Sequence, residues 1–361
     1  MVEPVRYTHD VERPEPDEAE TIAGLEAQFE KILDTTSRDY GHAVRSVHAK
    51  GHGIARGKLR VADGLPPELA QGLFAQAGEY EAILRFSTNA GDILDDSIRL
   101  PRGVAIKVLG VAGERLPGSE GDATQDFVMA NAPTFAAPDP RKFLGNLKLL
   151  AATTDKAEGG KKLLSAVLRS FEAALEAVGG QSAMLSTLGG AKPVHPLGAT
   201  YFSQTPFRYG AYIAKFQLVP VSGIADFADS TINATGRPDA IREAVNELLV
   251  EQGGTWDLRV QLCTDLDAMP IEDASVAWDE DASPYRTVAT LRVEPQAAWV
   301  AGASERTEDT LSFAPWHGLA AHRPLGGVNR ARRRPYQMSS DYRARFNGCP
   351  IHEPRALADV D

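Results

Sequence analysis

Two short segments near the start of the chain hold residues that could carry out acid–base chemistry. The first, R-S-V-H-A-K-G-H-G, covers Arg45–Gly53, and the second, R-F-S-T-N-A-G, covers Arg85–Gly91. His48 lies among small and apolar residues at the start of a predicted strand, Val47–Val61, whose glycines allow a backbone or a ligand to approach closely. A histidine shielded from water has a pKa pulled towards neutrality, which suits proton transfer. The simpler alternative is a structural histidine in the core.

The composition limits the class of protein. The chain has 361 residues, of which 43% are hydrophobic and 24% charged, so it can bury a core in one or two domains. Its net charge of −11 argues against a nucleic-acid partner, because phosphates are bound by patches of Lys and Arg. No apolar stretch approaches the roughly 20 residues of a membrane span. The acidic residues 1–20 lack the apolar segment of a signal peptide. We therefore expect a cytoplasmic protein.

Hydrophobic periodicity predicts strands interspersed with helices. Residues 1–20 are expected to form a disordered tail or an arm that wraps a partner subunit of a homo-oligomer. An amphipathic helix follows, with apolar residues at helical spacing from Ile22 to Leu33. Runs rich in Val, Ile and Phe, separated by turn residues, predict further strands at Ala82–Ser87, Gly103–Leu109, Asp126–Asn131, Tyr212–Val221, Asp257–Cys263 and Arg286–Val293. The other predicted helices are Pro140–Ala151, Lys161–Ala177 and Pro238–Glu251.

The order of these elements indicates a fold class. Strands without a regular strand–helix–strand alternation, with helices inserted between them, favour an antiparallel barrel or sandwich in an α+β domain. A barrel of about eight strands is wide enough to hold side chains or one small ligand.

Several segments are similar to the haem catalase family and occur in the family's order. They are H-A-K-G-H-G, L-R-F-S-T-N-A-G, L-P-R-G-V-A-I-K, Q-D-F-V-M-A-N-A-P-T-F, Y-F-S-Q-T-P-F-R-Y-G and T-L-S-F-A-P-W-H. The resemblance implies an α+β fold with a catalase-like eight-stranded antiparallel β-barrel and inserted and flanking helices. We expect an N-terminal arm and helix at 1–40, a haem-binding barrel core at 41–345 and a C-terminal tail at 346–361. This is the family's core without the helical region that follows in full-length members.

The resemblance assigns roles on the peroxide side of the haem. His48 matches the histidine that accepts a proton from peroxide and returns it to the leaving oxygen, which is general acid–base catalysis. Ser87 matches the serine that hydrogen-bonds this ring, and Val47 matches a valine that narrows the approach to iron.

The amide donor of this site is an open question. The family has two adjacent asparagines, the first of which orients the peroxide, whereas this chain has Ala130 followed by Asn131. Either the register shifts by one residue and Asn131 is the catalytic donor, or the site lacks that donor. The second case implies a weaker catalase with a roomier, more apolar pocket. As a residue without such a role, Asn131 simply ends a strand before Pro133.

The resemblance also implies a tyrosinate ligand to the haem iron. Counted from Phe313–Pro315, which is similar to the family's F-D-P segment, the ligand falls near Tyr336, and Arg332 precedes it by four residues. Side chains at i and i+4 share a helix face, so the guanidinium is expected beside the phenolate, where it lowers the phenol pKa. Pro335 departs from the family, which has a small residue there, and His317 is a rival ligand. We favour Tyr336.

Five further residues are implied to contact the cofactor. Arg343 follows the predicted ligand by seven residues, and together with Arg45 and Arg85 it is expected to neutralise two haem propionates. Phe135 and Phe143 match aromatic positions that line the access channel. Without the resemblance, these would be ordinary core phenylalanines and surface arginines. Arg45 and Arg85 fit a surface role least well, because they lie in apolar strands and burying an unpaired charge is costly.

The implied function is a haem-dependent, peroxide-consuming oxidoreductase. With heme b (iron protoporphyrin IX), the chain would be a catalase-related peroxidase or peroxygenase that acts on hydrogen peroxide or on organic or fatty-acid hydroperoxides. It would also need an unidentified organic reductant or substrate. Two alternatives are a non-catalytic protein for haem storage or sensing, which does not need His48, and a haem-free barrel for an apolar molecule. The second leaves Arg332 and Tyr336 unexplained.

Overall fold

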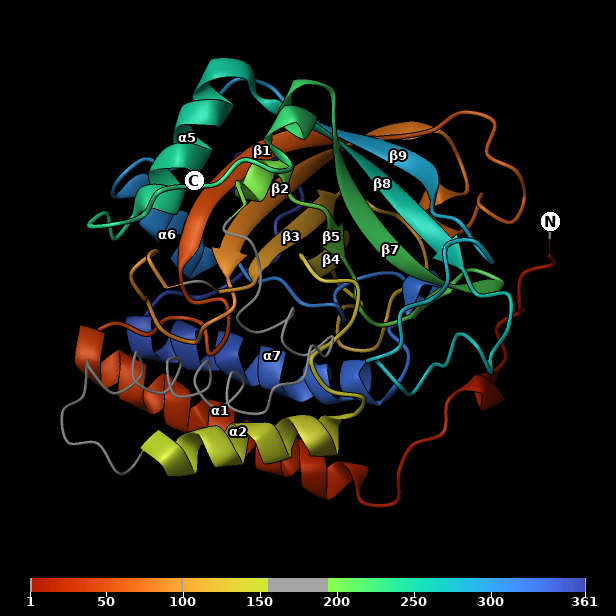
Figure 1. Ribbon diagram of the computed structural model, residues 1–361, viewed down its shortest axis with the longest axis horizontal. Coiled ribbons are helices and arrows are strands. Elements are labelled where there is room, and N and C mark those ends of the chain that lie inside the picture. Colours follow the sequence, from red (N-terminus) through yellow and green to blue (C-terminus); the bar gives the residue numbers. More distant parts are fainter. Residues whose placement is uncertain (1, 99, 155–193, 361) are drawn as a thin grey trace.

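The computed structural model describes residues 2–98, 100–154 and 194–360 (Figure 1). The helix expected at 161–177 lies outside the described residues, as does most of the loop expected at 179–200.

An antiparallel sheet closes on itself to form a barrel. Its hydrogen-bonded order is β5-β4-β3-β2-β1-β9-β8-β7, and β5 also pairs with β7, which closes a ring of eight strands within the described residues. The short strand β6 pairs with the same strand, β7. The strands are β1 Gly51–Val61, β2 Gly78–Thr88, β3 Arg102–Leu109, β4 Thr124–Ala130, β5 Tyr201–Phe202, β6 Phe207–Tyr209, β7 Tyr212–Val221, β8 Gly254–Leu262 and β9 Arg286–Val293. The predicted eight-stranded antiparallel barrel is confirmed.

Alternation along the strands places large apolar side chains inside the barrel. Phe86, Tyr201, Phe216 and Trp256 belong to this core, and each is at most 1% exposed. The β3 strand is buried on both faces. Its outer residues pack beneath Leu311, Phe313 and Val360, so the segment after the last barrel strand and the chain's tail cover this part of the wall.

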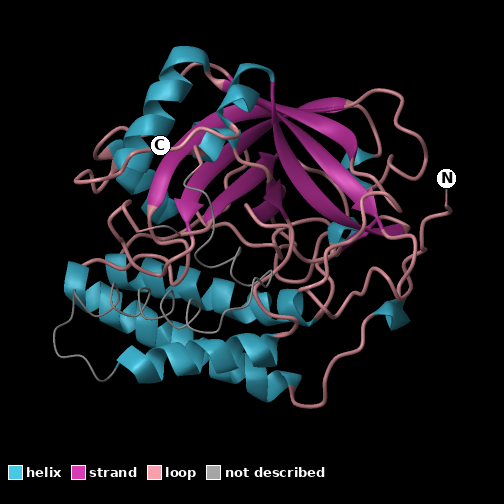
Figure 2. Cartoon of the chain, viewed as in Figure 1, coloured by secondary structure: helices cyan, strands magenta, loops and turns pink. Residues whose placement is uncertain are grey.

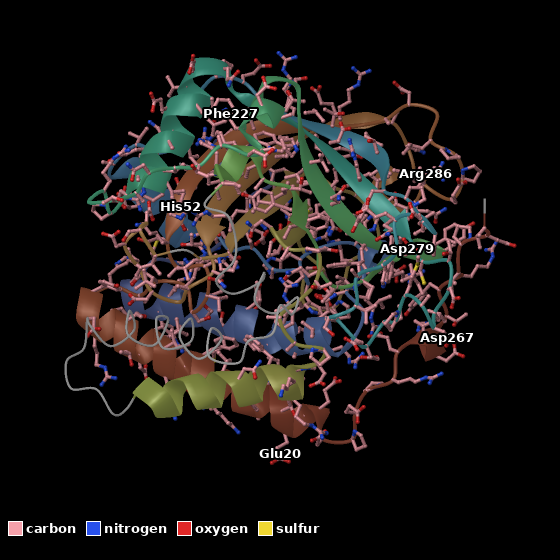
Figure 3. The ribbon with its side chains drawn as sticks, viewed as in Figure 1. Glu20, His52, Phe227, Asp267, Asp279 and Arg286 are labelled. Carbon is pink, nitrogen blue, oxygen red and sulfur yellow. The ribbon has the colours of Figure 1, made fainter. Side chains whose placement is uncertain are left out.

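Three helices form a layer against one end of the barrel (Figures 1 and 2). These are α1 Glu18–Tyr40, α2 Pro140–Thr154 and α7 Gly327–Asn347, while α5 Ala240–Gln252 and α6 Ala303–Thr310 lie against the barrel itself. Leu25 and Phe29, one turn apart on α1, pack with Leu144 of α2 and Ala331 of α7. The opposite face of α1 is polar, and Glu20 points away from the barrel (Figure 3). No helix in the described ranges is long and apolar enough to cross a membrane.

The structure corrects two expectations about the N-terminal half. Residues 2–20 are not a free tail, because the Val5 and Tyr7 amides donate to the Cys263 and Ala211 carbonyls of the same chain at 2.8 and 2.9 Å. Strand β1 begins at Gly51 rather than Val47, because the preceding turn includes His48 in the left-handed region, with a φ of 52°. The other predicted strands and the helices near residues 140 and 240 agree with the structure to within about four residues at each end.

Candidate functional site

His48 is held in place by backbone and side-chain contacts from three segments. Its amide donates to the Asn89 carbonyl at 3.2 Å, and its Nδ1 lies 3.0 Å from the Ser87 Oγ of β2. Behind the ring lies Gly103 of β3, where an added Cβ would come within 2.6 Å of the His48 Nδ1. The left-handed turn, the serine and the glycine together leave this ring little freedom, as a group that transfers protons requires.

The surroundings keep the His48 imidazole neutral. Burial is the main cause of a lowered pKa, and the guanidiniums of Arg85, Arg332 and Arg45 lower it further, to about 3. Neutral imidazole is the form that can accept a proton. Because Nδ1 is engaged by Ser87, the other ring nitrogen, Nε2, is the atom left for exchange with a substrate.

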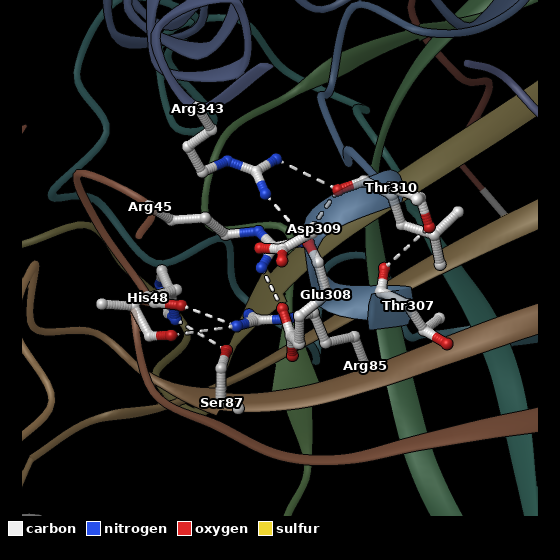
Figure 4. Close-up of polar contacts among 12 residues, drawn as sticks. Arg45, His48, Arg85, Ser87, Thr307, Glu308, Asp309, Thr310 and Arg343 are labelled. Carbon is white, nitrogen blue, oxygen red and sulfur yellow. Dashed lines mark hydrogen bonds and ion pairs between the residues drawn. The ribbon is translucent and has the colours of Figure 1, made fainter. Parts of the chain in front are cut away.

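Three arginines gather around Glu308, at the end of α6 (Figure 4). The Arg85 Nε donates to both carboxylate oxygens at 2.8 and 2.9 Å, and Arg45 pairs with the same carboxylate. Arg45 and Arg343 also donate to the Leu311 carbonyl at 2.9 and 3.1 Å. The structure thus brings the three predicted arginines together, and a carboxylate from the protein lies among them.

The charge of this cluster does not balance within the protein. Burial by itself raises the pKa of Glu308, but the neighbouring Arg45 and Arg85 outweigh it and lower that pKa to about 2, so the carboxylate is ionised. Three guanidiniums against the Glu308 carboxylate leave a surplus of positive charge in a largely buried place, although the Asp309 carboxylate, which also pairs with His42, offsets part of it at Arg343. Such a site favours a negatively charged ligand.

On α7, Arg332 and Tyr336 meet as their spacing predicts. The Arg332 Nη2 donates to the Tyr336 Oη at 2.9 Å, and the guanidinium carbon lies 5.2 Å from the centre of the tyrosine ring. Pro335 lies inside this helix, which nevertheless runs unbroken to Asn347. Proline has no N–H for the Ala331 carbonyl, so α7 lacks one main-chain bond beside Tyr336.

Two adjoining pockets bring His48 and Tyr336 together. They share these two residues with Phe29, Val47, Val128, Met129 and Pro335. The first pocket extends to Arg45, Arg85 and Arg343. The second extends between α1 and α2, past Phe135 and Phe143, whose ring centres are 5.1 Å apart. One end of the combined cavity is thus cationic, and the other is apolar.

Asn131 does not lie in this cavity. Its side-chain oxygen accepts a hydrogen bond from the Arg102 amide at 2.8 Å, and its own amide donates to the Arg102 carbonyl at 3.1 Å. Ala130 lines the cavity instead. The expectation that Asn131 is the catalytic amide donor is therefore not met, because its oxygen closes the edge of β3 and β4. The alternative remains, in which Ala130 takes the donor's position.

His317, the rival iron ligand, is occupied elsewhere. Its Nδ1 lies 3.4 Å from an Asp126 oxygen and 3.2 Å from a Glu353 oxygen. Burial opposes protonation, but Asp126 and Glu353 outweigh it and raise the pKa of His317 to about 9. A protonated imidazole has no lone pair for a metal. His317 lines neither of the two pockets that His48 lines.

Two residues of the site were missed at the level of sequence. A carboxylate such as Glu308 could have been expected from the charges, because the three predicted arginines carry one more positive charge than two propionates can neutralise. Asn329 is fully buried one turn before Arg332, and its Oδ1 lies 3.3 Å from the Arg332 Nη1. Its position three residues before Arg332 on the same helix was the available signal.

The comparison with protein families decides the identity of the fold. A family model described as Catalase matches residues 42–299, which is more than two thirds of the chain. The chain belongs to the catalase family. None of the curated proteins compared with the chain matches it.

Solved catalase structures share the fold. A fungal catalase is 20% identical with a TM-score of 0.63, over 86% of this chain and 62% of its own. Catalase A from Saccharomyces cerevisiae is 21% identical with a TM-score of 0.63, over 96% and 69% of the two chains. A bacterial catalase is 20% identical with a TM-score of 0.58, over 97% and 66%. This chain therefore spans about two thirds of the length of these catalases.

Membership of the catalase family implies haem as cofactor, and the residues of the cavity fit that group. The surplus positive charge around Glu308 suits the propionates of a haem. The Tyr336 phenol, at the cavity wall beside Arg332, is an oxygen donor of the kind that binds ferric haem. The walls between these polar ends are mostly apolar, as a porphyrin face requires.

Proposed function

We propose that this protein is a haem-dependent enzyme that reduces peroxides, with His48 as the proton-transfer residue and Tyr336 as the iron ligand. The observation that carries the proposal is that one cavity is lined by both residues, each with the partner its task needs. Ser87 orients the His48 ring from Nδ1, and Arg332 donates to the Tyr336 oxygen. We propose residues 41–345 as the functional unit.

The proposed work of His48 is to move one proton between the two oxygens of the peroxide. Neutral Nε2 accepts the proton of one peroxide oxygen and returns it to the other, which leaves as water or as an alcohol. The complete reaction consumes two electrons and two protons per peroxide, and an organic reductant supplies the electrons. Haem b, when bound, supplies the redox chemistry that cleaves the O–O bond. Because the pKa of His48 is low, its protonated form gives the proton up readily.

The proposed holding residues divide into two groups. Arg45, Arg85 and Arg343 would neutralise the propionates of a bound haem, while Glu308 limits the positive charge that the protein carries without them. The Arg332 guanidinium donates a hydrogen bond to the Tyr336 oxygen and so orients the atom that would bind iron.

The cavity wall favours organic peroxides over hydrogen peroxide. Ala130 offers no hydrogen bond where the family has an amide, so a small polar peroxide is oriented by fewer groups. Phe135 and Phe143, with Leu25 and Phe29 of α1, form an apolar wall that suits a hydrocarbon chain. We therefore propose fatty-acid or similar organic hydroperoxides as the preferred substrates.

Replacement of His48 tests this function against simple haem binding. We expect His48→Ala to keep its haem and to lose peroxide reduction by ~10²–10⁴-fold, the usual contribution of general acid–base catalysis. His9→Ala, a change at an exposed histidine, is the matched control and should keep full activity. The assay is the initial rate of loss of a fatty-acid hydroperoxide per bound haem, with a phenol as reductant. Unchanged turnover in His48→Ala would refute the proposed mechanism and favour a role in haem storage or sensing.

A further inference from the structure

Asn329 is the centre of a buried hydrogen-bond network at the start of α7. The residue is 0% exposed. Its Nδ2 donates to the Pro206 and Leu325 carbonyls at 2.9 and 3.1 Å, and its Oδ1 accepts from the Thr205 hydroxyl at 3.0 Å. Its main-chain carbonyl accepts from the Trp316 Nε1 at 2.8 Å. These bonds tie the first turn of α7 to the segment between β5 and β6.

The same network fixes which way the Asn329 amide points. Two carbonyl oxygens lie at the Nδ2 end, and of the two ends of the Asn329 amide only the NH₂ group can donate to them. A flipped amide would set its oxygen against those carbonyls and its NH₂ group against the Arg332 guanidinium. The oxygen is therefore the atom that faces Arg332, at 3.3 Å from Nη1.

The guanidinium of Arg332 connects this oxygen to Tyr336. Its Nη1 donates to Asn329, and its Nη2 donates to the Tyr336 Oη at 2.9 Å. Because the guanidinium is planar, holding one of its two ends also orients the other. Within the described residues, these are the hydrogen bonds that the Arg332 side chain makes. Without Asn329, the long and only partly buried Arg332 side chain would keep only its bond to the tyrosine.

We propose that Asn329 is a positioning residue, which aims the Arg332 guanidinium at the Tyr336 oxygen and so secures haem binding. The inference rests on the proposed function, in which Tyr336 is the iron ligand. It assigns the orientation of the Arg332 guanidinium to a side chain that lines neither of the two pockets shared by His48 and Tyr336. Outer partners of this kind typically change metal affinity by about 10–100-fold.

A double-mutant cycle separates positioning from mere anchoring of the helix. In Asn329→Leu, a change of similar volume, we expect haem transfer to apomyoglobin to be faster by roughly 10-fold. The visible spectrum of the remaining ferric haem should change as well. In an Arg332→Ala background, Asn329→Leu should have no further effect, because the residue through which it acts is absent. Equal effects in both backgrounds would mean that Asn329 only anchors α7, and would overturn the inference.

Two further variants complete the test. Trp316→Phe removes the hydrogen bond to the Asn329 main-chain carbonyl but leaves the Asn329 side chain intact. Haem loss should therefore stay near the wild-type rate. Haem loss as fast as in Asn329→Leu would again indicate anchoring alone. If Asn329→Leu does not fold, Asn329→Ser replaces it in the same double-mutant cycle, because a serine is too short to reach the guanidinium. An unchanged haem spectrum in Tyr336→Phe would refute the proposed iron ligand, a failure distinct from that of Asn329.

Discussion

A methyl group added behind His48 should disable the enzyme without removing its haem. In Gly103→Ala, the new Cβ would lie 2.6 Å from the His48 Nδ1 and 3.2 Å from the Ser87 Oγ. The β3 backbone itself accepts alanine, because Gly103 is not among the glycines with positive φ. The ring of His48 must move, because it is the end of a side chain, whereas the new Cβ is fixed to the backbone of strand β3.

The distances set the size of the effect. Ordinary van der Waals contact begins near 3.4 Å, and the His48 Cε1 lies still closer to the new Cβ than Nδ1 does, so the imidazole has to move by about 1 Å. A misplacement of about 1 Å in a reacting group costs on the order of 10²-fold in rate. The methyl group also crowds the hydrogen bond between His48 and Ser87 that sets the ring's orientation. We therefore expect peroxide reduction by Gly103→Ala to fall by ~10²-fold, with haem content unchanged.

The assay is the rate of peroxide loss per haem, with haem content measured separately. Gly121→Ala is the matched control, because a Cβ at Gly121 meets nothing within 4 Å and its φ is not positive. Gly103→Ala in a His48→Ala background should cost nothing more, since the residue it displaces is gone. Normal activity in Gly103→Ala, with the Gly121 control also normal, would refute the role given to His48 and its position here.

The remaining predictions concern the iron ligand, the missing amide and alkaline stability. Tyr336→Phe should purify with little haem or with a different spectrum, whereas His317→Ala should keep the wild-type spectrum; the reverse result would reassign the ligand. Ala130→Asn should raise turnover of hydrogen peroxide relative to a fatty-acid hydroperoxide, and steady-state rates with both peroxides check this. The pKa of His317 is raised from 6.5 to about 9, so its stabilisation is complete below pH 6.5 and lost as pH rises through 9. The free energy of unfolding should therefore fall by at most ~3 kcal/mol between pH 6.5 and 10, and His317→Gln should flatten this slope in denaturant titrations.

Local pattern was enough to predict most of the barrel. Strand β9, Arg286–Val293, matches its predicted range, and β7 does so too, because alternating apolar residues between turn signals are a property of the chain alone. The beginning of β1 was missed for a tertiary reason. Positive φ at His48 is unfavourable for a non-glycine residue, and contacts with Asn89 and Ser87 support it. No sequence pattern encodes those contacts.

For the site, the sequence by itself determined residue types and helical spacing. Arg332 and Tyr336 meet because residues four apart share a helix face, whatever surrounds the helix. Only the tertiary structure decided how distant charges and amides are used. Glu308 lies more than 200 residues from Arg85, yet its carboxylate joins the arginine cluster. Asn131 is drawn to the backbone of Arg102 on the neighbouring strand. A buried polar group must find a partner, and which partner is within reach depends on how the chain packs.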